Sequence, residues 1–466
     1  MENRLDPNYY QKIYMDLEKV VAKRTKYKLR DFIELMAGGV TPKVTEQDKY
    51  YTDSTNGVPF LRVQNLSPEG LDWSDCKYIN KDTHNGLLKR SQVFQGDLLI
   101  KITGVGRMAI TSIAPEGFEG KINQHIVTVK TKNPELNEQI AAFLNSDVGE
   151  MLATHRTTGG TRPALDYVAL RSIPIILNDR VPEIMRQAYD EKKRKEKEIN
   201  ALQESINEYI LCELGVVMPL KNEKLFANKF FLTSEKQLTL NRFDPEYYAD
   251  NYQKIISAIE KSPYEKMELS QITEKIFSGT TPKMNDYSEE KTKYAVIKAG
   301  SYTKDFINLG LVAYSKKAPL KRARQNDIFI LSAAHQSNYV GKSIKFLRDT
   351  PDENTGFVGE LICVRANQRI NPLLLFYILK LDLYKELLNR EKRGQTAHIY
   401  SKDISKIRVP VPAWEKQMEM NEKIEKIIQE TERLEYEGLK IIKSAKLKAE
   451  KIFLGRRLDD KKHGVN

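Results

Sequence analysis

Cationic and amide side chains gather in the predicted turns of this chain, outside any regular apolar pattern. Lys and Arg neutralise phosphates, and Arg, Gln and Asn can form paired hydrogen bonds with base edges. The candidates are Lys43, Arg62, Gln64, Lys101, Arg107, Arg156, Arg162, Lys283, Lys298, Lys321, Arg322, Arg324, His335, Gln336, Asn338, Lys342, Lys392, Arg393 and Gln395. Together they predict contact with a DNA duplex. For each residue taken singly, a solvated surface position is the competing interpretation.

Two short groups carry the strongest prediction of base or phosphate contact. Lys321 to Arg324 precedes the predicted strand at residues 327–331, and the loop at residues 335–339 follows it. A third group, the basic run from Lys192 to Lys195, lies on a predicted helix. That run predicts either contact with a DNA backbone or a solvated helix face.

Motifs for cofactor and metal binding fail on their context. Residues 104–109 fit the letters of a dinucleotide fingerprint, but the following residues are typical of a strand, and the fingerprint requires a helix there. A tight hairpin is the better interpretation. The Gly341-Lys342-Ser343 triplet lacks the earlier glycine of a phosphate loop, since Gln336 stands in its place. No two of the six histidines have metal-binding spacing. The sequence therefore predicts no catalytic residue, no metal ligand and no cofactor bound by this chain.

The overall composition bounds the class of protein. With 466 residues, 40% of them hydrophobic and 30% charged, the chain is predicted to form more than one folded domain. A net charge of +12 favours a polyanionic partner, although a basic surface without a ligand is the alternative. Three widely spaced cysteines suit a reducing cytosol. We expect a cytoplasmic location and no membrane partner, because no apolar run approaches the roughly 20 residues that a membrane span needs.

The chain contains an internal repeat. Five short patterns recur in the same order at offsets of 230 to 240 residues. They are residues 4–10 with 242–248, 39–43 with 279–283, 96–100 with 326–330, the Gly/Thr-rich loop 156–162 with 390–396, and Gly215 with Gly455. Ordered matches of this kind predict a tandem duplication with loops of different length.

Each copy is predicted to be rich in short strands. In the first copy these are residues 58–63, 97–102, 108–113 and 125–129, separated by Gly, Pro and Asn turns. A helix is predicted at residues 134–152, with its counterpart at 371–388. Residues 219–240 are predicted to connect the copies.

Two long helices follow the copies. Apolar residues recur at steps of three and four, which predicts a narrow seam that needs a facing helix. The seam residues are Ile199, Leu202, Ile206, Tyr209, Ile424, Ile427, Leu434 and Ile441. Both helices end at a Leu-Gly pair, where glycine can adopt the left-handed conformation that stops a helix. We therefore predict an antiparallel pair of helices that spaces two copies of one globular unit.

This arrangement resembles the DNA-specificity subunit of type I restriction–modification systems. The resemblance spans residues 4–455 and rests on the duplicated Arg-x-Asp-Pro-x-Tyr-Tyr openings, the Gly-x-Thr-Pro-Lys turns, the Gly/Thr loops and the two helices. It implies an α+β fold, with two β-rich target-recognition domains separated by a coiled coil. The implied boundaries are 1–180 for the first domain, 181–222 for the central helix, 223–413 for the second domain, 414–455 for the C-terminal helix, and 456–466 for a charged tail.

The resemblance also implies a function and partners. Each domain would read one half of a bipartite, asymmetric DNA target, and the helices would dock two adenine-methyltransferase subunits and, through them, possible restriction subunits. S-adenosylmethionine would bind in the methyltransferase, and ATP and Mg²⁺ in a restriction subunit. This chain would be non-catalytic.

Three alternatives stay open at this point. The chain could be a coiled-coil adaptor for protein partners, or the specificity subunit of a type IIB-like or methylation-only system. A nuclease or methyltransferase acting alone is the third, and the missing cofactor and metal motifs argue against it.

Overall fold

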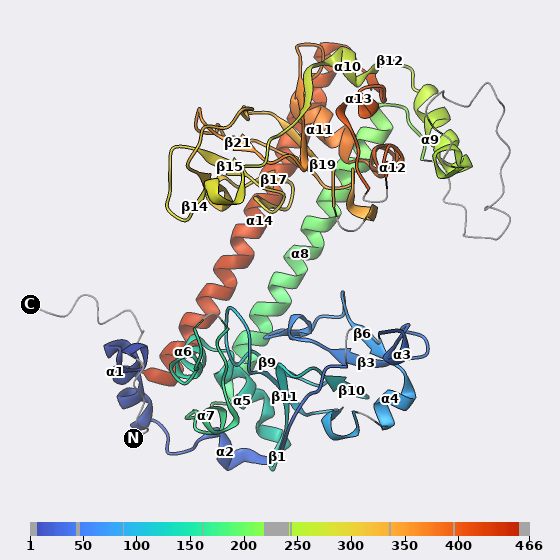
Figure 1. Ribbon diagram of the computed structural model, residues 1–466. Coiled ribbons are helices and arrows are strands. Elements are labelled where there is room, and N and C mark those ends of the chain that lie inside the picture. Colours follow the sequence, from blue (N-terminus) through green and yellow to red (C-terminus); the bar gives the residue numbers. More distant parts are fainter. Residues whose placement is uncertain are drawn as a thin grey trace, which may run out of the picture. The chain divides into compact units, whose positions relative to one another are not determined.

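The chain divides into two compact units (Figure 1). Unit 1 comprises residues 1–197 and 434–466, and unit 2 comprises residues 198–433. The computed structural model describes residues 7–42, 47–86, 88–160, 162–218, 242, 245–334, 337–394 and 397–455. The charged tail and the whole of the predicted connector, residues 219–240, lie outside these ranges. Both predicted long helices are divided between the units, one after residue 197 and the other after residue 433.

Unit 1 contains two main sheets. The first has the order β1 (Ile33–Gly38), β11 (Ile126–Thr131), β8 (Leu98–Lys101) and β9 (Thr111–Ile113), all antiparallel. The second has the order β2 (Tyr51–Thr52), β6 (Lys77–Ile79), β3 (Val58–Leu61), β10 (Glu119–Ile122) and β7 (Gln92–Phe94), with β3 and β10 parallel. A short ribbon joins β4 (Leu66–Ser67) to β5 (Gly70–Leu71).

Unit 2 repeats the pairings of these sheets. Its larger sheet has the order β13 (Thr273–Ser278), β22 (Leu361–Ala366), β19 (Ile328–Leu331), β20 (Ile344–Phe346), β17 (Phe306–Ile307) and β16 (Tyr302–Thr303). The other sheets are β14 (Tyr287–Ser288), β18 (Ala313–Ser315), β15 (Ala295–Ile297) and β21 (Gly356–Phe357), and the pair β12 (Glu265–Glu268) with β23 (Arg408–Val411). The β1–β11 and β13–β22 pairs carry an irregularity at the same place, after Ile33 and Thr273. The parallel β15–β21 pair likewise corresponds to β3–β10.

Each predicted helix at residues 134–152 and 371–388 is two helices. In unit 1, α5 (Asn137–Leu144) ends before Ser146, whose hydroxyl accepts a hydrogen bond from the Gly149 amide and starts α6 (Asp147–His155). In unit 2, the extended backbone of Leu381 separates α11 (Pro372–Lys380) from α12 (Asp382–Arg390). The single-helix prediction was wrong because apolar spacing continues across both breaks, while a serine cap or one extended residue decides where a helix stops.

Other predicted strands differ at their ends. The strand predicted at residues 108–113 begins only at Thr111, because Ala109 adopts a positive φ of 53° that a strand cannot accommodate. The short helices of unit 1 are α1 (Lys12–Ala22), α2 (Leu29–Phe32), α3 (Gln47–Tyr50), α4 (Lys81–Asn85) and α7 (Tyr167–Arg171). Those of unit 2 are α9 (Asp250–Glu260), α10 (Leu269–Ile272) and α13 (Ser401–Ile404).

The two long helices are α8 (Arg180–Glu213) and α14 (Trp414–Leu454). Each is followed by a glycine with positive φ, 62° at Gly215 and 73° at Gly455, as predicted. In unit 2, Lys416 pairs with Glu213 at 2.7 Å, and the Lys423 ammonium lies 3.9 Å from the ring centre of Tyr209. The helix segments within unit 2 therefore run in opposite directions.

The predicted seam residues differ in burial. Ile199, Ile206, Ile424 and Leu434 are buried, and Leu202, Tyr209, Ile427 and Ile441 are half-buried. Ile206 and Ile424 belong to the main core of unit 2, and Phe453 of α14 packs edge-on against Phe143 in the core of unit 1 at 5.0 Å. Each core therefore extends from a sheet onto part of the helices.

Candidate nucleic-acid interface

A basic hollow of about 490 Å³ opens at the edge of the larger sheet of unit 2. Its charged lining consists of Lys275, Lys321, Arg322, Arg324 and Arg365 against the single carboxylate of Glu353. Phe277 and Leu320 are among its apolar residues. A concave surface with this excess of positive charge attracts anions and is suited to phosphate groups.

The sheet holds two of these cations side by side. Lys275 on β13 is the register partner of Arg365 on β22. Both surround the ring of Phe277, with the Lys275 ammonium 5.1 Å and the Arg365 guanidinium 5.4 Å from the ring centre. The Lys321 ammonium lies 6.0 Å from the same ring. An aromatic face stabilises nearby cations electrostatically, so Phe277 concentrates positive charge at the floor of the hollow.

A buried carboxylate fixes the arginine of this floor. Asp327 is fully buried and binds Arg365 with both oxygens, at 2.7 and 2.8 Å. These hydrogen bonds raise the pKa of Arg365. The Asp327 carboxylate also accepts a hydrogen bond from the Arg324 backbone amide at 2.7 Å, which fixes the turn that follows the basic loop. The pair therefore sets the position of both the strand and the loop that line the hollow.

The loop side of the hollow is open to solvent. Lys321, Arg322 and Arg324 are all exposed. The Lys321 ammonium donates to the Ser278 carbonyl at 2.6 Å, and Arg324 lies 3.3 Å from Glu274 in an exposed pair. Both contacts are weak enough at the surface for the cations to exchange them for phosphate oxygens.

Comparison with known proteins identifies this part of the chain. Residues 261–443 match the family model for the type I restriction modification DNA specificity domain. This segment belongs to the type I restriction–modification DNA specificity family. All five cations of the basic hollow lie within the specificity domain.

Solved structures give a weaker likeness. The S subunit of a type I restriction-modification system from M. genitalium is 14% identical, with 92% of this chain and 96% of that chain covered and a TM-score of 0.38. The HsdS subunit from Thermoanaerobacter tengcongensis is 13% identical over the same shares, with a TM-score of 0.33. A structure described as showing complex assembly and conformational transition of the type I R-M system is also 13% identical over these shares, with a TM-score of 0.41. Comparison with curated protein sequences gave no match.

The structure joins loops that are distant in sequence. In the specificity domain, a bridge between Ala333 and His398 brings the loop after β19 against the loop after α12. In unit 1, bridges from Thr103 and Thr158 meet at Ala164 and join the equivalent two loops. The sequence singled out both loops of each copy, and only the fold places them together.

Several predicted contact residues are bound within the protein. In unit 1, the buried Lys101 ammonium donates to the Val105 carbonyl at 2.8 Å, and burial lowers the Lys101 pKa. Arg107 binds Asp147 at 3.1 Å and Glu150 at 2.9 Å. It also donates to the Asn145 carbonyl, so it ties together the break between α5 and α6.

Three further residues have similar internal partners. Arg156 binds Glu18 at 2.5 Å and the Ser172 hydroxyl at 2.9 Å, which attaches α1 to α6. In the specificity domain, Lys342 pairs with Glu386 at 2.6 Å, and Arg393 with Asp403 at 2.7 Å. These contacts give each of the three side chains a structural role.

A preorganised polar group of unit 1 includes two predicted residues. The Arg62 guanidinium donates to the Asp75 carboxylate at 2.8 Å, and the Gln64 amide donates to it at 3.1 Å. The Gln64 hydrogen bond, followed by those of Arg62, lowers the pKa of Asp75. Gln64 is exposed and Arg62 half-buried, and the Arg62 Nε is buried without a hydrogen-bond partner, so Gln64 is the more accessible donor of the two.

The other predicted contact residues fall into three groups. Arg162, Lys283, Lys298 and Asn338 are exposed, and Lys392 is half-buried. Lys43, His335, Gln336 and Gln395 lie outside the described residues. In the basic run on α8, Lys192 pairs with Glu69 and Glu196, Arg194 with Glu191, and Lys195 with Glu437, while Lys193 is exposed.

Among the cationic and aromatic residues of the hollow, sequence reasoning missed Lys275, Phe277 and Arg365. The alternation of Lys275 and Phe277 along one strand face was a usable signal. Arg365 had none, because only strand pairing brings it beside Lys275. Among the described residues, no group of three or more His, Cys, Asp or Glu side chains is placed to hold a metal ion. None of the described helices has the length and apolar character to cross a membrane.

Proposed function

We propose that this chain is the DNA-specificity subunit of a type I restriction–modification system and carries out no catalysis itself. It reads a bipartite, asymmetric duplex target, with one half read by each unit. The basic hollow within the specificity domain of unit 2 is the observation that carries this proposal. It supplies phosphate contacts that set the position of the domain, while the neighbouring exposed loops read base edges.

The two units are built to read different sequences. Leu35 and Lys130 occupy in unit 1 the register positions that Lys275 and Arg365 occupy in unit 2. The shared sheet supports a common docking mode, and the changed side chains support an asymmetric target. In unit 1 the exposed Arg162, together with Gln64 and Arg62, supplies the predicted contacts.

The long helices act as the spacer. The helix contacts within unit 2, together with the Lys195–Glu437 pair at 2.6 Å within unit 1, support an antiparallel coiled coil. Such a coil separates two target-recognition domains, which we place at residues 1–180 and 223–413. Its two similar ends dock two modification subunits, which bind S-adenosylmethionine and methylate adenine. Restriction subunits that use ATP and Mg²⁺ join through these.

Mapping of methylated adenines tests the proposal. The chain is expressed with its modification subunits in a host without other adenine methylation, and modified bases are located by single-molecule sequencing. We expect one two-part motif with unlike halves. Exchange of residues 1–180 for those of another specificity subunit should alter one half only. A change in both halves, or no methylation motif, would refute bipartite reading. Absence of duplex binding at low salt would instead favour the adaptor alternative.

A further inference from the structure

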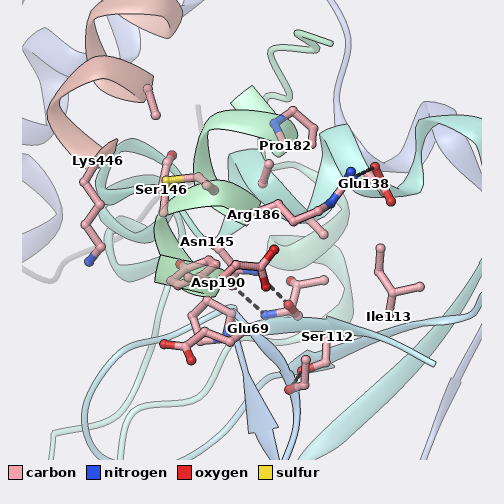
Figure 2. A pocket seen from close by; sticks show the side chains of 18 residues that line it. Glu69, Ser112, Ile113, Glu138, Asn145, Ser146, Pro182, Arg186, Asp190 and Lys446 are labelled. Carbon is pink, nitrogen blue, oxygen red and sulfur yellow. Dashed lines mark hydrogen bonds and ion pairs between the residues drawn. The ribbon is translucent and has the colours of Figure 1, made fainter. Parts of the chain in front are cut away.

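Unit 1 contains a cavity of about 250 Å³ between α5, β9, α8 and the C-terminal part of α14. Figure 2 shows its lining, with Ser112 and Ile113 of β9, Glu138 and Asn145 of the α5 region, Arg186 and Asp190 of α8, and Lys446 of α14 around one space. Small apolar residues line its floor, among them Ala141, Ala142 and Ala449. We call this space the alanine cavity.

In unit 2, aromatic side chains fill the equivalent space. Counting back from the aspartates that begin α6 and α12, Ala141 corresponds to Phe376 and Ala142 to Tyr377. Ile113 pairs with Leu98 on β8, as Phe346 pairs with Ile328 on β19. The counterparts in unit 2 are thus the buried residues Phe346, Phe376 and Tyr377. The ring centre of Phe376 lies 5.4 Å from that of Phe346 and 4.9 Å from that of Tyr377. Smaller side chains at these positions open the cavity in unit 1.

Most charged groups around the cavity already have partners. Arg186 binds Glu138 at 2.7 Å and Glu183 at 3.0 Å, and Lys446 lies 3.3 Å from Asp147. The Asn145 side-chain amide accepts a hydrogen bond from the Thr111 backbone amide at 2.9 Å and donates one to the Thr111 carbonyl at 2.7 Å. Glu69 is paired with Lys192 at 3.0 Å.

Asp190 is the exception. Within the part of the chain that the structure describes, its carboxylate has neither an ion pair nor a side-chain hydrogen bond, and it is exposed at the mouth. The adjacent Tyr189 stays a neutral phenol, since burial, followed by the nearby Glu69, raises the pKa of Tyr189 to about 12. The mouth therefore offers one uncompensated negative charge and one hydroxyl group to a ligand.

We propose that the alanine cavity binds an aromatic side chain of a modification subunit, with a Lys or Arg of the same segment paired to Asp190. The partner's ring packs on the apolar floor, in the space that aromatic side chains of this chain's own fill in unit 2. A dry cavity of about 150 Å³ accommodates benzene, so a space of this size has room for a phenol or indole ring. Buried aromatic and arginine anchors of this kind dominate protein interfaces. The partner's identity rests on the proposed function, whereas the chemistry of the cavity does not.

Free tryptamine tests the cavity chemistry, since it carries an indole ring and an ammonium group. Binding to the full chain is followed by ligand-observed NMR and calorimetry, with indole-3-acetate as the control of opposite charge. For a fragment of this size we expect a Kd of about 0.1 to 1 mM. Ala142→Tyr should weaken tryptamine binding at least about tenfold by filling the space, and Asp190→Asn about fivefold by removing one exposed charge pair. Ala22→Tyr, at an exposed position of α1, is the matched control.

Thermal unfolding shows that the variants fold: Ala142→Tyr should melt no lower than wild type, because the ring fills existing space. Equal tryptamine binding by wild type and a folded Ala142→Tyr variant, or tighter binding of indole-3-acetate, would overturn the proposal.

Assembly with the purified modification subunit tests the occupant. Ala142→Tyr should weaken assembly about tenfold or more, and saturating tryptamine should compete with it, while Ala22→Tyr should assemble normally. Unchanged assembly of the folded Ala142→Tyr variant would overturn the proposal. If wild type itself failed to assemble with any modification subunit, the proposed function would fail, and the tryptamine titration would still decide whether the cavity binds a cationic aromatic group.

Discussion

Removing charge from the basic hollow should weaken DNA binding in a salt-dependent way. The double variant Lys321→Gln, Arg322→Gln eliminates two of the five cations that line it, both at exposed positions of one loop. Lys275 and Arg365 are left in place, so the strand pairing and the Asp327 contact persist. The variant therefore changes the electrostatics of the hollow while sparing the sheet.

Counterion release sets the size of the effect. Each neutralised phosphate contributes about 0.9 to the slope of log K against log salt. If both cations contact phosphates, the magnitude of the slope falls by about 1.8. Binding should then be roughly 30-fold weaker at 0.15 M salt and only about 3- to 4-fold weaker at 0.5 M.

Fluorescence anisotropy with a labelled duplex of about 30 base pairs measures this slope between 0.05 and 0.5 M salt. The matched control is Lys254→Gln with Lys261→Gln, which removes the same charge from exposed positions of α9 and its end, outside the hollow. An equal loss in the control would mean that net charge alone is responsible. A loss that does not vary with salt would refute phosphate contact by this loop.

Three further outcomes follow from the structure. Burial lowers the pKa of Lys121 from 10.5 to about 8, so below pH 8 the folded protein bears the full free-energy cost of a buried ammonium. Lys121→Met should therefore raise the free energy of unfolding by roughly 3 kcal/mol below pH 8, and this gain should vanish above about pH 10.5. Urea unfolding at several pH values measures the difference. Asp327→Ala leaves Arg365 without its partner and should lower the free energy of unfolding by about 3 kcal/mol. Adding Arg365→Met to this variant should restore part of that stability, and additive effects of the two substitutions would contradict the prediction. Inserting seven residues into both α8 and α14 keeps the apolar seam in phase and lengthens the coiled coil by about 10 Å. The spacer of the methylated motif should then grow by about three base pairs, and an unchanged spacer would contradict the spacer role of the helices.

Periodic and repeated features could be predicted from the sequence. The ends of both long helices follow from local chemistry, because glycine at positions 215 and 455 tolerates the positive φ that stops a helix. The repeated patterns also led to matching strand pairs, since residues 96–100 and 326–330 lie at equivalent places in the two sheets. The family resemblance was confirmed for residues 261–443. The predicted DNA contacts stay predictions.

Only the tertiary structure decided the internal partners of Arg107 and Arg156 and the basic hollow. Arginine has the same sequence appearance whether it binds a phosphate or a helix end, because the choice depends on which carboxylates and carbonyls the fold brings within reach. The alanine cavity likewise depends on packing, since a pair of alanines reads as ordinary helix until the neighbouring strand and helices show that nothing fills the space beside them. Residue spacing along the chain determines local secondary structure, whereas contacts between segments distant in sequence form the sites.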